Sequence, residues 1–558
     1  MHNIIKYKKI SNLCEFFIEQ ESKNPNKKFL YSKIKDKWVG NSYVEIKKKI
    51  SKIASFLLKK KVNKNDRVLL ISENRPEWFI FDMAIMSIGA VTVPCFSTNN
   101  ENDNNFIIKD CKPKIIVLES SNLFKKNQKT LKLLKKKIVL IDKPSKDFLT
   151  FEDIIKKEDD FNFDTNIKGS DLSTIIYTSG TSGYPKGVML SHSTIIHNCY
   201  AAYELLKDFN FSNERFFSFL PLSHSYERMA GLYFPLSIGA EIYYCESLDK
   251  INKNFLEIKP TIMTAVPRLY ENIYKKIFRK IQNSNFLIKF CFLKFSLLHR
   301  TKKLNTRNIL FRNLIAFLLK KKIRKIFGGK LKTFVSGGAA LSPEIGQFFI
   351  NLGVNILQGY GQTESGPLIS CNYLKTNDVS TVGKPVKDVN VKISRDNEIL
   401  VKGPNVMMGY WNNYELTKKT LRNKWLHTRD LGLIDDLGRL KIIGRKKDLI
   451  VTSGGENISP TKIENLLTEN LDINQAVVFG DNRSYIVAIL TLEKKIKNDA
   501  ISRIVDRTNK KLNIPEKIRK YAIIQSPFTY ENGLLTNTLK IKRQAVLERY
   551  KKIIEGLY

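Results

Sequence analysis

The sequence predicts an α/β protein with a large N-terminal body of layered α/β subdomains, a small β subdomain, and a small, mobile α+β domain at the C-terminus. Two observations predict this class. Short apolar runs alternate with segments of helical spacing through most of the chain, and short strands separated by turns replace them near residue 390. The 558 residues also suffice for more than one domain, because single cores stop growing at roughly 250–300 residues.

The first elements are a helix and a series of buried strands. Residues 43–61 carry apolar side chains at helical spacing, and RVLLIS at 67–72 is typical of a buried strand that ends in a turn at 74–76. Alternation of such strands with helices favours a parallel sheet covered by helices. Four further runs predict strands of the same kind: 114–119, 137–142, 173–178 and 261–266.

The last third of the chain has a different pattern. VNVKIS, EILVKG, GLIDD and GRLKIIG predict a small β subdomain. An amphipathic segment at 460–470, the strands AVVFG and YIVAILTLE, and a helix near 499–511 then predict a compact α+β domain. We therefore expect two domains, 1–443 and 444–558.

The chain is strongly basic, with 94 Lys and Arg against 54 Asp and Glu and a net charge of +40. Such a charge attracts phosphates, nucleic acid or anionic lipid. An AT-rich coding sequence would produce the same excess of lysine, with many lysines only solvating the surface. The charge therefore does not select a ligand.

The seven cysteines include no close CxxC pair, so neither a zinc site nor a disulfide framework is indicated. The start, MHNIIKYKKISNLCEFF, lacks an apolar signal core with a cleavage site. We expect a cytoplasmic protein, with peripheral contact to the inner face of the membrane as an open alternative.

The segment YTSGTSGYPKGV at 177–188 carries the most informative chemistry, and it differs from the GxxxxGK[ST] loop of other nucleotide enzymes. Glycines let backbone N–H groups turn toward an anion, hydroxyls donate hydrogen bonds, and the lysine adds charge. A Ser/Gly-rich stretch alone is more often a flexible loop. As a phosphate cradle the segment would provide Thr178, Ser179, Gly180, Thr181, Ser182, Gly183 and Lys186.

The full string closely resembles the signature loop of the adenylate-forming (AMP-binding) superfamily, which includes acyl-CoA synthetases, firefly luciferase and peptide-synthetase adenylation domains. Further segments resemble motifs of the family in the family's order: SGGAALSP at 336–343, QGYGQTES at 358–365, HTRDLG at 427–432 and GRKKDLIVTSGGENISP at 444–460. Each residue taken singly could be a cap, a turn residue or a surface charge. Together they imply an enzyme that uses ATP, Mg²⁺ and coenzyme A.

The resemblance also implies roles for single residues. The segments at 336–343 and 358–365 would lie around the adenine, with Tyr360 against its ring. Thr363 would touch the α-phosphate, and Glu364 would hold Mg²⁺. The same two segments supply the other candidate nucleotide-binding residues: Gly338, Ala339, Gln358, Gly359 and Gly361.

In the later segments, Asp430 would bind the ribose hydroxyls, and Arg445 would lie on the ribose and phosphate side. Lys540, in LLTNTLKIKR, would bridge the carboxylate and the phosphate during adenylation. Lys447 matches the hinge between the two domains of the family.

Two residues depart from the family's pattern. Arg429 stands where the family usually has Gly before the ribose aspartate, and Asn537 stands where this branch often has Pro. The first departure places a bulky cation beside Asp430 and leaves the ribose geometry open.

SFLPLSHSYERMAG at 218–231, with TAVPRLYE, SENRPEW and GAVTVP, resembles the long-chain acyl-CoA synthetase branch. The branch implies a long-chain fatty-acid–CoA ligase that forms acyl-AMP and then a thioester. His224 would lie near the substrate carboxylate, with a structural histidine as the competing interpretation.

Three alternatives are a fatty acyl-AMP ligase that loads a carrier protein, a ligase for a shorter or aryl acid, and a non-catalytic lipid- or nucleic-acid-binding scaffold. The key side chains are all present and no specific nucleic-acid element is recognisable, which disfavours the third.

Residues 275–332 form a basic, apolar insertion whose apolar runs, such as FLIKFCFLKFSLL, are too short to span a bilayer. They could lie on an anionic membrane surface beside the mouth of the substrate site. Equally, they could form two helices packed on the body, with solvated lysines.

Overall fold

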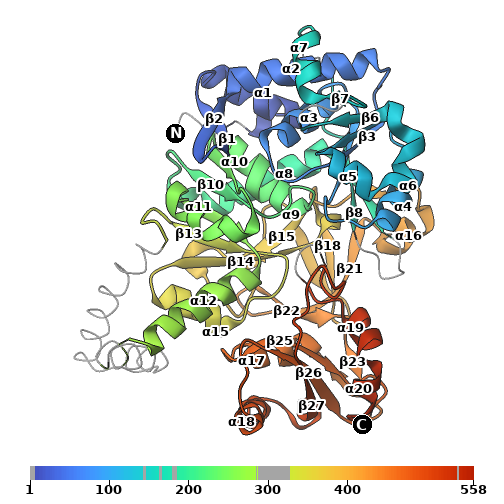
Figure 1. Cartoon of the computed structure of the whole chain (residues 1–558). Helices are drawn as coiled ribbons and strands as arrows, with labels where there is room; N and C mark the ends of the chain where they lie inside the picture. Colours follow the sequence, from blue (N-terminus) through green and yellow to red (C-terminus); the bar gives the residue numbers. More distant parts are fainter. Residues whose placement is uncertain are drawn as a thin grey trace.

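The computed structural model describes residue 5 and residues 7–142, 146–161, 166–178, 185–284, 286, 289, 327–536 and 540–558. A large body carries the N-terminus, and a smaller body that carries the C-terminus lies against one end of it (Figure 1). In this described part of the chain, no helix combines the length and the apolar character needed to cross a bilayer.

One sheet of the large body contains four of the predicted strands, 67–72, 114–119, 137–142 and 173–178. Its order is β19-β9-β8-β4-β3-β5-β6-β7; the strands from β8 to β7 run parallel, and β9 and β19 run antiparallel to their neighbours. The members are β3 (Arg67–Ile71), β4 (Val91–Cys95), β5 (Ile115–Leu118), β6 (Ile138–Leu140), β7 (Leu149–Thr150), β8 (Leu172–Thr178), β9 (Lys186–Ser191) and β19 (Gly409–Tyr410).

The second sheet of the large body includes the predicted strand 261–266 as β12. Its order is β16-β15-β14-β13-β12-β10-β11-β1-β2, parallel from β14 to β1 and antiparallel at both ends. The members are β1 (Lys28–Ile34), β2 (Lys37–Ser42), β10 (Arg215–Ser218), β11 (Glu241–Tyr244), β12 (Ile262–Ala265), β13 (Thr333–Ser336), β14 (Asn355–Gly361), β15 (Leu368–Cys371) and β16 (Lys384–Pro385).

Helices fill the space between the two sheets and cover their outer faces. The central layer comprises α1 (Leu13–Lys23), α2 (Tyr43–Lys59), α3 (Pro76–Ser87), α7 (Phe151–Lys157), α8 (His192–Leu206), η4 (Arg228–Tyr233) and α10 (Phe234–Ser237). On the outer face of the first sheet lie α4 (Glu101–Cys111), α5 (Ser121–Lys126) and α6 (Gln128–Leu131), and on that of the second lie α11 (Ile251–Ile258), α12 (Pro267–Gln282) and α15 (Pro343–Asn351).

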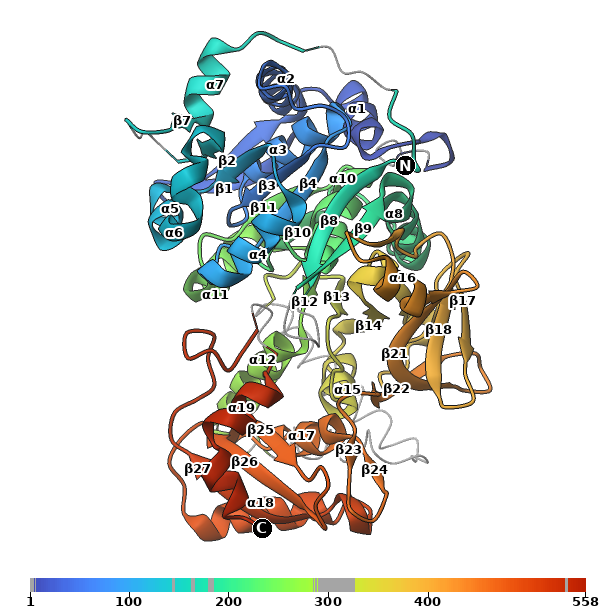
Figure 2. The ribbon, with the colours of Figure 1, turned by 90° about the vertical axis from the view of Figure 1, so that its right-hand side faces the viewer.

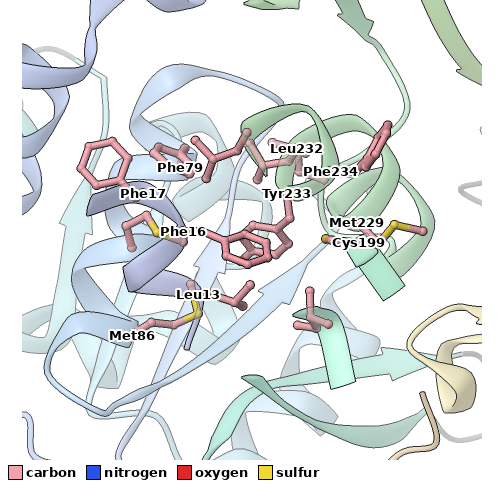
Figure 3. Close-up of a cluster of buried hydrophobic side chains, with 14 of the residues drawn as sticks. Leu13, Phe16, Phe17, Phe79, Met86, Cys199, Met229, Leu232, Tyr233 and Phe234 are labelled. Atoms are coloured by element: carbon pink, nitrogen blue, oxygen red, sulfur yellow. The ribbon is translucent and has the colours of Figure 1, made fainter. Parts of the chain in front are cut away.

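The central helices share one apolar core with the strands. Phe16, Phe79, Cys199 and Tyr233, which come from four different helices, converge there (Figure 3). Strand β3 explains the continuous apolar runs of the sequence. Alternate residues of β3 face the central core and the outer helices, so the strand is buried on both faces. This layering confirms the predicted α/β class.

Two further sheets follow along the chain, as the change of pattern near residue 390 indicates. The strands β17 (Asn390–Ile393), β18 (Glu398–Lys402), β20 (Leu421–Arg422), β21 (Trp425–Ile434) and β22 (Leu440–Arg445) form a small sheet beside α16 (Tyr414–Thr420), to one side of the body in Figure 2. The C-terminal body is built on β25 (Ile473–Phe479), β26 (Ile486–Leu492) and β27 (Ile518–Ile524), with β23 (Ile450–Val451), β24 (Asn457–Ile458), α17 (Pro460–Thr468), α18 (Asn498–Asn509), α19 (Arg543–Arg549) and α20 (Lys551–Glu555).

The basic insertion begins within α12, and most of its later residues, including all of FLIKFCFLKFSLL except Phe286 and Lys289, lie outside the described residues. Its membrane contact stays a prediction. The described beginning contacts the C-terminal body: Lys275 is buried, and its Nζ donates to the Ile473 carbonyl at 2.7 Å and lies 3.4 Å from Glu493. Arg279, one turn later, donates to the Leu471 carbonyl at 3.0 Å. This lysine of the insertion is therefore an interdomain contact rather than a solvated side chain.

A buried arginine links the central helices to the first sheet. Arg228 of η4 donates to Asp82 of α3 at 2.5 Å and to the Thr174 hydroxyl of β8 at 2.6 Å. The hydroxyl of Tyr233 donates to the second carboxylate oxygen of Asp82. Arg228 and Asp82 are 2% and 0% exposed, so each charge depends on the other for its compensation.

Asp82→Ala is expected to lower the free energy of unfolding by about 3–5 kcal/mol, because it leaves the buried Arg228 guanidinium without its carboxylate. Urea denaturation followed by circular dichroism measures the loss. Asp436→Ala, at an exposed carboxylate, is the control and should change stability by less than about 0.5 kcal/mol. Equal stabilities of the two variants would contradict the assigned role of Arg228.

Candidate functional site

The predicted phosphate loop connects β8 to β9. Thr178 ends β8, Lys186 begins β9, and the two residues are register partners in the antiparallel pair. The residues between them that the sequence singles out, Ser179, Gly180, Thr181, Ser182 and Gly183, lie outside the described residues. Both described ends of the loop are therefore held together at one end of the first sheet.

Lys186 belongs to a cluster with an aromatic ring and a carboxylate. Its Nζ lies 5.6 Å from the ring centroid of Tyr410, whose hydroxyl donates to Glu364 Oε1 at 2.9 Å. Desolvation lowers the pKa of Lys186, the charges of Arg429 and Lys447 lower it further, and Glu364 opposes them. Sequence reasoning missed Tyr410, because an aromatic residue in a short strand carries no distinctive signal.

Asp430 forms a second cluster, on β21. Its Oδ2 accepts from the Tyr360 hydroxyl at 2.7 Å, and its Oδ1 accepts from Nε of Arg445 at 3.0 Å. Asp430 and Arg445 are also register partners of β21 and β22. Desolvation and the neighbouring carboxylate raise the pKa of Tyr360 well above its usual value, so the phenol stays a donor. Three residues predicted for the nucleoside end thus meet here.

The backbone before Asp430 is unusual. Arg429 has a φ of +61°, in the left-handed region that suits glycine, which costs a residue with a side chain about 1–2 kcal/mol. Strand β21 also bulges here: one residue of β18 lies opposite three of β21, between the pairs Leu400–His427 and Glu398–Leu431. The conformation accounts for a glycine at this place in the family pattern, and this chain keeps the conformation with an arginine.

Thr363 is linked to the residue next to His224, Ser225, by a hydrogen bond. The hydroxyls of Thr363 and Ser225 are hydrogen-bonded at 3.1 Å, and His224 caps α9 (Ser225–Glu227), its Nδ1 accepting from the Tyr226 amide at 3.2 Å. Desolvation, with a smaller effect of Lys540, lowers the pKa of His224 to about 4. The imidazole is therefore neutral at pH 7, and its proton is on Nε2 because Nδ1 accepts.

In the two segments predicted to lie around the adenine, 336–343 and 358–365, two of the candidate residues are constrained by the surrounding protein. Gln358 is buried, and its side chain is engaged with the backbone of Leu341, Val379 and Thr381, so it positions the 336–343 segment. A Cβ on Gly361 would lie 1.7 Å from a carbonyl oxygen.

Three other candidate residues of these segments, Gly338, Ala339 and Gly359, have room around them. Gly338 has a φ of +82°, and Ala339 is exposed. A Cβ on Gly359 would meet only ordinary contacts at 3.6 Å or more. Space for a ligand therefore remains beside Gly338 and Ala339, while Gly361 is required by packing.

Lys540 comes to this site from the C-terminal body. Its amide donates to the Thr536 hydroxyl at 3.0 Å, which holds its backbone beside Thr536. Desolvation lowers the pKa of Lys540 to about 8; Arg445 lowers it further, and Asp430 and Asp448 oppose the shift. The residue is nevertheless exposed, so its side chain still reaches solvent. Lys540 is thereby placed near Asp430, Arg445 and His224.

The predicted Mg²⁺ site depends on the carboxylate of Glu364 and on the donors around it. The described residues contain no group of three or more His, Cys, Asp or Glu side chains arranged to hold a metal. Within the same residues, Oε2 of Glu364 accepts no hydrogen bond, while Oε1 accepts one from Tyr410. A single free carboxylate oxygen suits Mg²⁺, which is typically bound by one or two carboxylates together with substrate phosphates.

The layered body, the cation-lined site and the small second body that adds a lysine to it define an enzyme that binds a nucleotide. The family model of AMP-binding enzymes matches residues 17–411, and that of the AMP-binding enzyme C-terminal domain matches residues 447–558. The chain belongs to the family of AMP-binding enzymes.

Relatives and solved structures resemble the chain over nearly its full length. A long-chain-fatty-acid–CoA ligase of Mycobacterium bovis, FadD15, is 28% identical, with 98% of this chain and 97% of the relative covered. Long-chain-fatty-acid–CoA ligase 5 of Mus musculus is 28% identical, with 94% and 84% covered. The anthranilate CoA ligase AuaEII in complex with anthranoyl-AMP has the same fold, at a TM-score of 0.79, 20% identity and coverage of 98% and 99%.

The lowered pKa of Lys540 predicts selective chemical modification. At pH 7.5 about a quarter of its amine is neutral, given a pKa of about 8, whereas an ordinary lysine is almost fully protonated. We expect an amine-acylating reagent to modify Lys540 at least about tenfold faster than the exposed Lys418, with half-maximal rate near pH 8. Peptide mass spectrometry measures both rates, and equal rates would contradict the placement of Lys540.

Proposed function

We propose that this enzyme activates a long-chain fatty acid as acyl-AMP and transfers the acyl group to coenzyme A. One observation carries the proposal: Lys540, from the C-terminal body, lies within electrostatic range of Asp430, Arg445 and His224. Family membership and the long-chain ligases among the relatives support the same reaction. ATP, the fatty acid and coenzyme A are the proposed substrates.

The first half-reaction joins the fatty-acid carboxylate to the α-phosphorus of ATP and releases pyrophosphate. Asp430, fixed by Tyr360 and Arg445, would bind the ribose hydroxyls, and Thr363 would face the α-phosphate. Lys186 would neutralise charge on the phosphates. The principal contribution of the protein is electrostatic, since preorganised cations stabilise charge that develops in the transition state.

Lys540 and His224 would hold the two reacting groups. Lys540 is mostly protonated at pH 7, given its pKa of about 8, and bound anions would favour its charged form further. Its ammonium can bridge the carboxylate and the α-phosphate. The neutral His224 has Nε2–H available as a donor to the acid, since Nδ1 already accepts from Tyr226.

Glu364 would hold Mg²⁺ through Oε2, while Tyr410 orients the carboxylate. A bound Mg²⁺ neutralises phosphate charge and orients the leaving group.

In the second half-reaction the thiol of coenzyme A attacks the acyl carbonyl, and AMP leaves. We propose that rotation near Lys447 withdraws Lys540 and presents another face of the 444–558 domain, including the loop at 454–457, to the acyl-adenylate. The contacts of Lys275 and Arg279 with the C-terminal body belong to the present arrangement and would have to break in the rotation.

Lys540→Ala should lower acid-dependent pyrophosphate exchange by about 10²–10³-fold, because it removes the bridging cation of adenylation. Thiolysis of supplied acyl-adenylate should remain within about twofold of wild type, since that step does not use Lys540. Lys542→Ala, at an exposed lysine two residues later, is the matched control and should retain exchange. Exchange retained by Lys540→Ala would refute the assignment.

A panel of acids assayed with ATP, Mg²⁺ and coenzyme A tests the substrate class. We expect the rate of AMP release and the amount of thioester, identified by its mass, to rise with chain length into the long-chain range. The reason is that each buried methylene contributes about 0.8 kcal/mol to binding. Aryl and short-chain acids are the comparison within the panel, and an acyl-carrier protein replaces coenzyme A in a parallel assay. A preference for an aryl acid or for the carrier protein would overturn the proposed substrate or acceptor.

A further inference from the structure

We propose that Arg429 binds the polyphosphate of ATP beside Lys186 and is thus an additional phosphate-binding residue of this enzyme. The inference rests on the proposed function for its ligand. Four observations support it: a strained backbone inside a strand, a bulge that reorients consecutive side chains, a guanidinium without a partner among the described residues, and proximity to the cluster of Lys186, Tyr410 and Glu364.

Arg429 differs from the other positive-φ residues of the chain. In the described residues, the other non-glycine residues with positive φ fall in turns or bends or at the ends of helices, as Lys424 does between β20 and β21. Arg429 lies inside β21, two residues from buried Leu431. Strained backbone that the surroundings enforce is concentrated at functional sites.

The bulge changes the direction in which β21 presents its side chains. The Arg429 amide donates to Glu398 Oε1 at 2.9 Å, and the Asp430 amide donates to the Thr428 hydroxyl at 3.1 Å, so side chains hold the irregular backbone. In a regular strand, consecutive residues face opposite sides of a sheet. A bulge with a left-handed residue breaks this alternation and lets Arg429 and Asp430 serve one site.

The guanidinium of Arg429 has no partner within the part of the chain that the structure describes: no hydrogen bond or ion pair joins it, and the side chain is only half-buried. The neighbouring carboxylate of Glu398 is already used by the Arg429 amide and lies 3.5 Å from His427. Arginine carries five N–H donors and no acceptor, so an unpaired guanidinium in a site suits an anion with several oxygens.

The charge of Arg429 acts at the phosphate end of the site. It depresses the pKa of Lys186, whose Nζ lies 5.6 Å from the centroid of the Tyr410 ring. Arg429 and Lys447 therefore add positive charge near Lys186, and Glu364 is the carboxylate that opposes their effect on it. Like charges at this density repel, and a polyphosphate would relieve the repulsion.

Arg429→Gln tests the inference by titration calorimetry of the full chain with ATP and Mg²⁺, with inorganic pyrophosphate, and with AMP. We expect the dissociation constants for ATP and pyrophosphate to rise about 10- to 100-fold, since a charge-assisted pair is lost. AMP lacks the β- and γ-phosphates, so its dissociation constant should change by less than about twofold. Arg429→Lys, which keeps the charge, should bind ATP more tightly than Arg429→Gln.

Arg429→Gly and Lys424→Gly separate strain from binding. Both remove a side chain from a left-handed position, so both should raise the unfolding temperature. Only Arg429→Gly should weaken binding of ATP, because Lys424 is exposed in a turn.

Unchanged ATP and pyrophosphate affinities in Arg429→Gln, an equal loss of AMP affinity, or Arg429→Lys no better than Arg429→Gln would each overturn the inference. Wild-type enzyme that binds ATP but shows no acid-dependent exchange would overturn the proposed function alone.

Discussion

The ion pair between Arg228 and Asp82 holds the centre of the large body together. It joins a central helix, the π-helical turn η4 and, through Thr174, the first sheet. Burying two charges is costly, and removing one partner is costlier still, so this pair enforces one arrangement of the elements that meet there. Arg228 begins η4, which follows α9, and His224 caps α9. The ion pair of Arg228 with Asp82 therefore also fixes the segment that supplies His224 and Ser225 to the site.

The charged residues of the site form two clusters. Asp430, satisfied by Tyr360 and Arg445, marks one end, and Lys186 with Glu364 and Tyr410 marks the other. Positive charge exceeds negative charge at the Lys186 end, which favours an anionic ligand there. Desolvation, with a smaller effect of neighbouring cations, depresses the pKa of Lys186 and of Lys540. Lys540 and Arg445, at the Asp430 end, still reach solvent. The departure from the family's pattern at Arg429 fits this distribution, because it adds charge to the Lys186 end.

The second body contributes both chemistry and constraint. Lys540 lies near the site in this docked arrangement, and the docking contacts include cations of α12 that bind backbone carbonyls of residues 471–474. Such contacts depend on geometry rather than on extensive apolar burial, which suits an interface that forms and breaks. The first turn of the basic insertion therefore contacts the C-terminal body.

The sequence by itself determined the class of fold and predicted the chemistry of the site. Apolar runs such as 67–72 predict parallel strands because such strands are buried on both faces, and local motifs indicate phosphate-binding residues because backbone freedom, hydroxyls and charge occur together. Only the tertiary structure decided which residues meet. Tyr410 joins Glu364 and Lys186 from separate parts of the chain, Gln358 is committed to the backbone, and Lys275 is an interdomain contact. The φ of Arg429 was equally beyond sequence reasoning, because its left-handed conformation is enforced by the bulge between β18 and β21 and not by local preference. Local pattern records what each segment prefers; contacts between distant segments arise only when the whole core is packed.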